Sequence, residues 1–238
     1  MINFKITFLF FLLCLNHGIC ISQKKIIVGA EQIDKFLPIL KNKKVGIVAH
    51  QASIINSKTH LVDSLLSLNV NIQKVFAPEH GFRGNLDAGE VFINDIDNKT
   101  KLPVISLYGK KKKPSDEDLN GISIMVFDLQ DVGVRFYTYL STLHYIMEAC
   151  SEKNIPLLLL DRPNPNIHYI DGPVLDLDNK SFVGMHPVPI VYGMTIGEYA
   201  KMINGEGWLN GGKKCDLKVI QIKNYNHKTS YNLKIRPS

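Results

Sequence analysis

Runs of apolar and β-branched residues recur along the chain and set the strongest limit on its fold. They occupy residues 45–49, 72–77, 102–107, 122–129, 155–160 and 217–222. The runs are continuous rather than alternating, which is typical of strands that are covered on both faces. Helical periodicity lies between them at residues 59–68, with Ser57 as a candidate N-cap, and at residues 140–150 and 195–204. This alternation predicts an α/β, Rossmann-like fold in which helices cover both faces of a mostly parallel sheet.

The N-terminal segment predicts export. Lys5 precedes an apolar run at residues 6–15, and small residues follow. This order is typical of a signal peptide, and the run is shorter than the roughly 20 apolar residues that span a bilayer. We therefore expect a signal peptide at residues 1–22, cleavage near residues 20–23, and a periplasmic or extracellular protein without a membrane span. An uncleaved anchor, or a lipoprotein modified at Cys20, stays open as an alternative. Residues 23–238 are expected to form one Rossmann-like catalytic domain.

Several classes of protein are not supported by the composition. After removal of the signal peptide two cysteines remain, Cys150 and Cys215, so a single disulfide is the most that can form. The formal net charge is +6, but the lysine run at residues 110–113 contains no aromatic residues, and no nucleic-acid partner is expected. A basic exported protein can still be attracted to an anionic polymer such as cell wall.

Motifs that would bind a cofactor are also missing from the sequence. No Gly-x-Gly-x-x-Gly follows the first predicted strand, and the chain has neither a P-loop nor a Gly-x-Ser-x-Gly nucleophile elbow. We therefore expect no cofactor and no metal, and a serine hydrolase is disfavoured.

Polar and titratable residues follow the predicted strands. In an open parallel sheet, ligands bind in the crevice beyond the carboxyl ends of the strands. Taken singly, these residues also have structural explanations, such as a helix cap at Glu79 or an ion pair between Asp161 and Arg162. Taken together they predict one site for acid/base chemistry on a polar substrate. The candidates are His50, Gln51, Glu79, His80, Arg83, Asp128, Gln130, Asp131, Arg135, Tyr137, Tyr139, Asp161, Arg162 and Asn164.

An ordered set of motifs resembles one known family. The matching segments are residues 46–53, 78–84, 127–139, 160–165 and 193–198, within roughly residues 44–222. Their sequences resemble the N-terminal part of the peptidoglycan exo-β-N-acetylmuramidases, the NamZ-type glycosidases once classed as a domain of unknown function. The resemblance implies release of terminal N-acetylmuramic acid from the non-reducing end of peptidoglycan fragments. It also implies a smaller C-terminal domain, which we expect to be missing from this chain.

The chemistry of glycoside hydrolysis suggests roles for the catalytic candidates. Most glycosidases use one carboxylic acid and one carboxylate. Glu79 is our candidate for the acid, because burial beside Phe82 would keep it protonated near neutrality. Asp128 and Asp131 are candidates for the second group, and a phenol from Tyr137 or Tyr139 is an alternative. Retention and inversion of configuration both remain open.

The substrate suggests roles for the binding candidates. Muramic acid carries a lactyl carboxylate, which a guanidinium binds through two parallel hydrogen bonds, so Arg135 or Arg162 is expected there. His80 is expected to orient Glu79 or to contact a sugar hydroxyl, and Asn164 to hold the N-acetyl group. The other substrate-binding candidates are His50, Gln51, Arg83, Gln130, Tyr139 and Asp161.

Two other functions remain open. A non-catalytic exported module that binds cell-wall muropeptides or glycans would use the same arginines and tyrosines without needing Glu79. A metal-dependent hydrolase would use His50, His80 and Asp161 as three ligands beside a water molecule.

Overall fold

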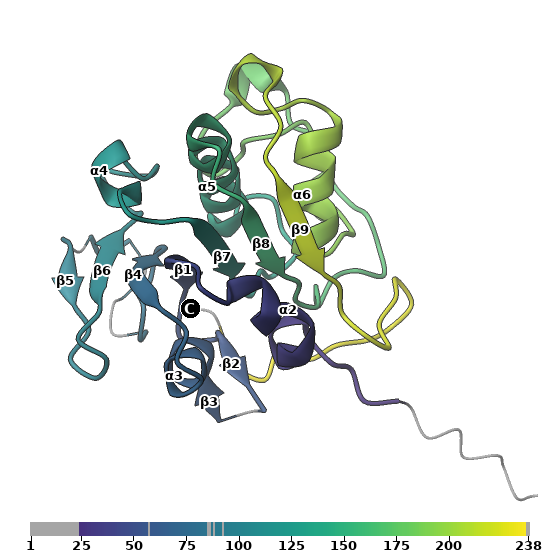
Figure 1. The fold of residues 1–238 in the computed structure, drawn as a ribbon. Helices are drawn as coiled ribbons and strands as arrows, with labels where there is room; N and C mark the ends of the chain where they lie inside the picture. Colours follow the sequence, from purple (N-terminus) through teal and green to yellow (C-terminus); the bar gives the residue numbers. More distant parts are fainter. Residues whose placement is uncertain (1–23, 57, 85–86, 88, 92, 237–238) are drawn as a thin grey trace, which may run out of the picture.

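The chain builds a seven-stranded sheet in a computed structural model (Figure 1), which describes residues 24–56, 58–84, 87, 89–91 and 93–236. The strand order is β5-β6-β4-β1-β7-β8-β9, and the pairs are parallel except that β5 is antiparallel to β6. This confirms the predicted α/β fold. The strands are β1 (Val45–Ala49), β4 (Ile72–Ala77), β5 (Asp95–Ile96), β6 (Pro103–Ser106), β7 (Ile124–Asp128), β8 (Leu157–Leu160) and β9 (Leu217–Ile220).

Helices lie on both faces of the sheet (Figure 1). One face carries α2 (Ile33–Leu40) and α3 (Leu61–Ser67), and the other carries α4 (Asp116–Leu119), α5 (Tyr139–Lys153) and α6 (Ile196–Gly205). The small elements are the hairpin of β2 (Ile54–Ile55) and β3 (Thr59–His60), and the 3-10 turns η1 (Gly29–Glu31), η2 (Leu177–Asn179) and η3 (Asn210–Gly212).

His60, rather than Ser57, caps α3, because its Nδ1 accepts a hydrogen bond from Val62 N. Ser57 and the predicted signal peptide at residues 1–22 lie outside the described residues, so export stays a prediction. Within the part of the chain that the structure describes, no helix is both long and apolar enough to cross a bilayer.

Alternate side chains of the central strands enter two separate cores. In β1, Val45 and Ile47 belong to the same core as Phe36 of α2, whereas Val48 belongs to the core that contains Leu143 of α5. Each of these side chains has no exposed surface. The strands therefore read as continuous apolar runs because both faces are buried, as the sequence predicted.

The order of connections creates a switch point at the carboxyl ends of β1 and β7. From β1 the chain moves outward through β4 and β6, and then returns to the other side of β1 to form β7, β8 and β9. The loops that follow β1 and β7 therefore diverge, which opens the crevice where doubly wound folds bind ligands.

The C-terminal segment, residues 221–236, crosses this edge of the sheet. In Figure 1 it runs in yellow from the end of β9 past the ends of the neighbouring strands. Tyr225 Oη donates to Asn164 O at 2.6 Å, and Gln51 Nε2 donates to Arg236 O at 3.4 Å. The segment thus closes one side of the crevice at the switch point.

Candidate active site

Glu79 lies in the loop after β4, where it contacts the end of the loop that follows β7. Its side chain is half-buried. Oε2 accepts a hydrogen bond from Thr138 Oγ1 at 2.8 Å, and Oε1 accepts one from Gly89 N at 3.1 Å. Burial, together with the nearby Glu79 carboxyl, raises the pKa of the Tyr108 phenol. One hydroxyl group, that of Thr138, therefore binds this carboxyl from another loop.

The surroundings of Glu79 differ from the dry pocket that we expected from Phe82. The Phe82 ring packs edge-on against His60 at 4.9 Å between centroids, and Arg83 lies over it at 4.2 Å. The Gly89 N–H and the Thr138 hydroxyl, both polar donors, bind the Glu79 carboxyl. Thr138 was not predicted as a site residue. Its position at the start of the helix that follows a predicted strand was the signal that could have found it.

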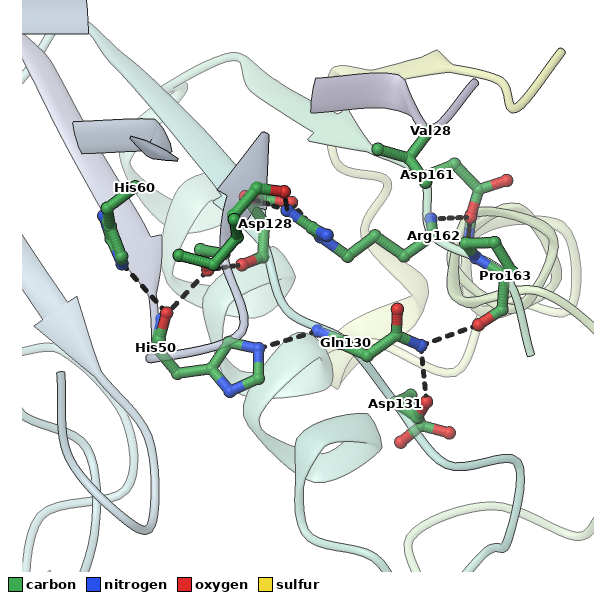
Figure 2. Close-up of polar contacts among 12 residues, drawn as sticks. Val28, His50, His60, Asp128, Gln130, Asp131, Asp161, Arg162 and Pro163 are labelled. Atoms are coloured by element: carbon green, nitrogen blue, oxygen red, sulfur yellow. Dashed lines mark hydrogen bonds and ion pairs between the residues drawn. The ribbon is translucent and has the colours of Figure 1, made fainter. Parts of the chain in front are cut away.

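His50 and Tyr139 form a buried chain of hydrogen bonds that ends at the backbone carbonyl of Glu79. His50 Nε2 accepts from Gln130 N at 2.9 Å (Figure 2), so this nitrogen carries no proton. Nδ1 then holds the proton and donates to Tyr139 Oη at 3.2 Å, and Tyr139 in turn donates to Glu79 O at 3.3 Å. Neither side chain has exposed surface. The structure therefore places both behind the site rather than at a surface that a substrate could touch.

Asp128 and Arg162 form a buried ion pair (Figure 2). Arg162 Nε lies 2.5 Å from Asp128 Oδ1, and Nη2 lies 2.9 Å from Oδ2. Burial alone would lower the pKa of Arg162, but the charge of Asp128 outweighs this effect and raises it. The structural ion pair that we considered between Asp161 and Arg162 is thus formed with Asp128 instead. Each group neutralises the other, which leaves neither a free base nor a free cation for a lactyl group.

Asp161 and Asn164 hold the turn that begins α6. Asp161 accepts hydrogen bonds from Thr195 Oγ1 at 2.9 Å and from Gly197 N at 2.8 Å. Burial nevertheless raises the pKa of Asp161 to about 7. Asn164 Nδ2 donates to Met194 O at 2.8 Å. Both side chains are buried and used within the protein, unlike the substrate contacts that we expected.

Asp131 is a buried acid with one unused oxygen. Its Oδ2 accepts hydrogen bonds from Gly133 N and from the Tyr192 hydroxyl. Its Oδ1 is buried and has no hydrogen-bond partner among the described residues. Burial raises the pKa of Asp131 to about 6. Tyr137, the phenolic candidate, is half-buried and packs edge-on against Tyr139 at 4.7 Å between centroids.

The two remaining arginine candidates bind other parts of the protein. Arg83 contacts Asp63 and Asp97, each at 2.9 Å, on the side of the sheet near β5. Arg135 Nη1 donates to the carbonyls of Pro173 and Val188. Both guanidinium groups therefore stabilise loops in this structure.

The residues of the metal-dependent alternative do not form one cluster. Both ring nitrogens of His50 are hydrogen-bonded within the protein. His80 is buried and has a left-handed backbone with φ of 70°, which is uncommon for a residue other than glycine. Across the described ranges, no three His, Cys, Asp or Glu side chains come together as potential metal ligands.

A crevice of about 660 Å³ lies at the switch point, beside the His50 and Gln130 contact. Gln130 and Arg162 line it from the sheet, and Tyr231 and Lys234 line it from the C-terminal segment. Its volume falls in the range of small-molecule sites. The other lining residues are Lys24, Lys25, Ile26, Val28, Glu31, Ala52, Ile54, Ser230 and Ile235.

Together, fold and site define a doubly wound α/β domain with a carboxyl-centred polar site at the carboxyl edge of its sheet. Comparison with known proteins makes the assignment specific. Residues 45–238 match the sequence model of the family described as "Exo-beta-N-acetylmuramidase NamZ, N-terminal", and the chain belongs to this family.

Individual relatives agree with this assignment. The peptidoglycan beta-N-acetylmuramidase NamZ of Bacillus subtilis (strain 168) is 43% identical over 206 residues, which cover 84% of this chain and 49% of that protein. Two crystal structures of DUF1343 family proteins from Bacteroides fragilis NCTC 9343 are also similar. One has a TM-score of 0.82 at 48% identity and covers 90% of this chain and 57% of its own. The other has a TM-score of 0.79 at 39% identity and covers 87% and 52%. The chain thus spans about half the length of these relatives.

Proposed function

We propose that this chain is the Rossmann-like domain of an exported exo-β-N-acetylmuramidase. In this proposal it hydrolyses terminal N-acetylmuramic acid from the non-reducing end of peptidoglycan fragments. The observation that carries the proposal is the position of Glu79, held by its own loop after β4 and by the loop after β7 in a chain of this family. The relative in Bacillus subtilis, named a peptidoglycan beta-N-acetylmuramidase, supports the choice of reaction.

Glu79 is assigned the role of general acid, which gives a proton to the oxygen of the departing sugar. Its half-buried carboxyl accepts a hydrogen bond from the Thr138 hydroxyl and forms no ion pair with a cation of the described residues. Asp131 and Tyr137 are the remaining candidates for the second group, since Asp128 is neutralised by Arg162. Both stereochemical outcomes stay compatible with this assignment.

The test uses the full-length protein with a chromogenic β-glycoside of N-acetylmuramic acid. We expect Glu79→Gln to lower kcat by about 10²–10⁴-fold, which is the usual contribution of a general acid. Glu90→Gln is the matched control, because Glu90 is an exposed acid in the same loop. Equal activity of Glu79→Gln and the wild type would refute the assignment of the acid. Equal turnover of the N-acetylglucosamine glycoside would refute the proposed preference for muramic acid.

The crevice at the switch point favours one second candidate, a module that binds muropeptides or glycans without cleaving them. Gln130, Arg162 and Tyr231 offer polar contacts between apolar walls there. Binding of N-acetylmuramic acid without any release of sugar from muropeptides would favour this candidate over the enzyme.

A further inference from the structure

We propose that Thr138 is a positioning residue for Glu79, and that its hydroxyl group holds the carboxyl in one orientation in both of its protonation states. This inference rests on the proposed function, because it assigns a role to a residue that contacts the proposed acid. Thr138 lies directly before α5, in the loop after β7, and contacts Glu79 from there.

The Thr138 hydroxyl does not cap the helix that follows it. Thr138 is the N-cap of α5, where a threonine side chain normally accepts a hydrogen bond from the first turn of the helix. Its side chain makes no such cap bond. Its Oγ1 instead donates to Glu79 Oε2 at 2.8 Å. The side chain at this helix start thus binds a carboxyl instead of a backbone N–H of its own helix. This supports a role of the contact in orienting Glu79.

The two residues at the start of α5 hold both parts of Glu79. Thr138 binds the side chain, and Tyr139 donates to the backbone carbonyl at 3.3 Å. Thr138 is itself fixed, because its own carbonyl accepts from Thr142 N at 2.9 Å and from Thr142 Oγ1 at 3.2 Å. Thr138 and Tyr139 are buried, so this arrangement cannot shift without disturbing the helix.

A hydroxyl group suits a carboxyl that changes its protonation state. It both donates and accepts, whereas a backbone N–H or an ammonium group can only donate. When Glu79 is ionised, Thr138 donates to Oε2. When Glu79 is protonated, the proton sits on Oε2 and is donated to Thr138, because Oε1 already faces the Gly89 N–H. The geometry therefore assigns Oε2 as the oxygen that carries the transferred proton.

The kinetic test removes the Thr138 hydroxyl. Thr138→Val keeps the shape of the side chain but removes its hydroxyl, and Thr138→Ser keeps the hydroxyl. We expect Thr138→Val to lower kcat about 10-fold or more with little change in KM, and Thr138→Ser to recover most of the loss. Ser151→Ala is the control, since it removes a hydroxyl at the other end of the same helix, where Ser151 donates to Glu148 O.

A second measurement separates this inference from the proposed function. Carbon-13 NMR of the Glu79 carboxyl follows its titration whether or not the protein cleaves a glycoside. Loss of a donor to the carboxylate should move the titration midpoint to higher pH by roughly half a unit to one unit in Thr138→Val. Absence of turnover in the wild type would refute the proposed function alone. Unchanged titration in folded Thr138→Val would overturn the positioning role.

Discussion

Arg162 and Asp128 bind each other at the carboxyl edge of the sheet through two parallel hydrogen bonds of 2.5 Å and 2.9 Å. Arg162 follows β8 and Asp128 ends β7, so the pair joins two neighbouring strands. Arg162 is 5% exposed and Asp128 is not exposed. Both residues were predicted as site residues, but their pairing gives them a structural role beside the crevice, which Arg162 lines.

The first prediction is that removal of one member of the Asp128–Arg162 pair lowers the free energy of unfolding far more than removal of both. Arg162→Met should lower the free energy of unfolding by about 3–5 kcal/mol, because it leaves the Asp128 charge buried and unpaired. The double variant Asp128→Leu with Arg162→Met should recover much of that loss. Urea unfolding of the single and double variants measures the coupling, with Arg236→Met as an exposed control. Additive effects of the two substitutions would contradict this account.

The second prediction concerns the turn at Gly133. Gly133 has φ of +82°, and a Cβ atom there would lie 1.9 Å from Asn164 Oδ1. Gly121 has a similar φ of +79°, but a Cβ atom there meets nothing within 4 Å. Gly121→Ala therefore reports the backbone strain alone, on the order of 1 kcal/mol. Gly133→Ala should lower Tm by clearly more, because Asn164 must also release its hydrogen bonds. Equal shifts in Tm would show that this close approach is unimportant.

The third prediction is a dependence of stability on pH through Asp131. Burial raises its pKa to about 6 in the folded protein, so between about pH 4 and pH 6 the folded state binds more protons than the unfolded state. Stability therefore falls as pH rises through this window. Asp131→Asn should remove this contribution, so the variant should gain on the order of 2 kcal/mol relative to the wild type between pH 4 and pH 8. The exposed Asp34→Asn is the control. A difference from wild type that stays constant with pH would contradict the raised pKa.

The order of strands and helices could be predicted because strands and helices that are buried in the protein carry a regular pattern of apolar residues in the sequence. β1 and β4 have the predicted bounds, since continuous apolar runs reflect strands covered on both faces. The short helix α2 and the edge strand β5 were missed. α2 contains Pro38, which is unusual inside a helix, and β5 has two exposed residues and therefore no apolar signature.

The convergence of polar residues was also predictable, but their partners were not. Chain position placed Asp128, Arg162 and Glu79 at one edge of the sheet. The pairing of charged side chains depends on the direction in which each side chain points, and that direction is set by the tertiary structure. Thr138 shows the same limit, because a threonine before a helix indicates a cap in any sequence. Only the structure shows its hydroxyl on Glu79.

The final prediction concerns Arg135, which we had expected to bind the lactyl carboxylate. Its Nη1 donates to the carbonyls of Pro173 and Val188, which lie in the long segment between β8 and α6. Arg135→Ala should therefore speed amide hydrogen exchange in residues 173–191, with a smaller effect in Arg135→Lys, which keeps one donor group near the carbonyls. Exchange around Glu79 should stay as in the wild type, and Arg236→Ala should change neither region. If Arg135→Ala weakens binding of N-acetylmuramic acid while exchange in residues 173–191 is unchanged, the guanidinium binds the substrate and the structural role assigned here is wrong.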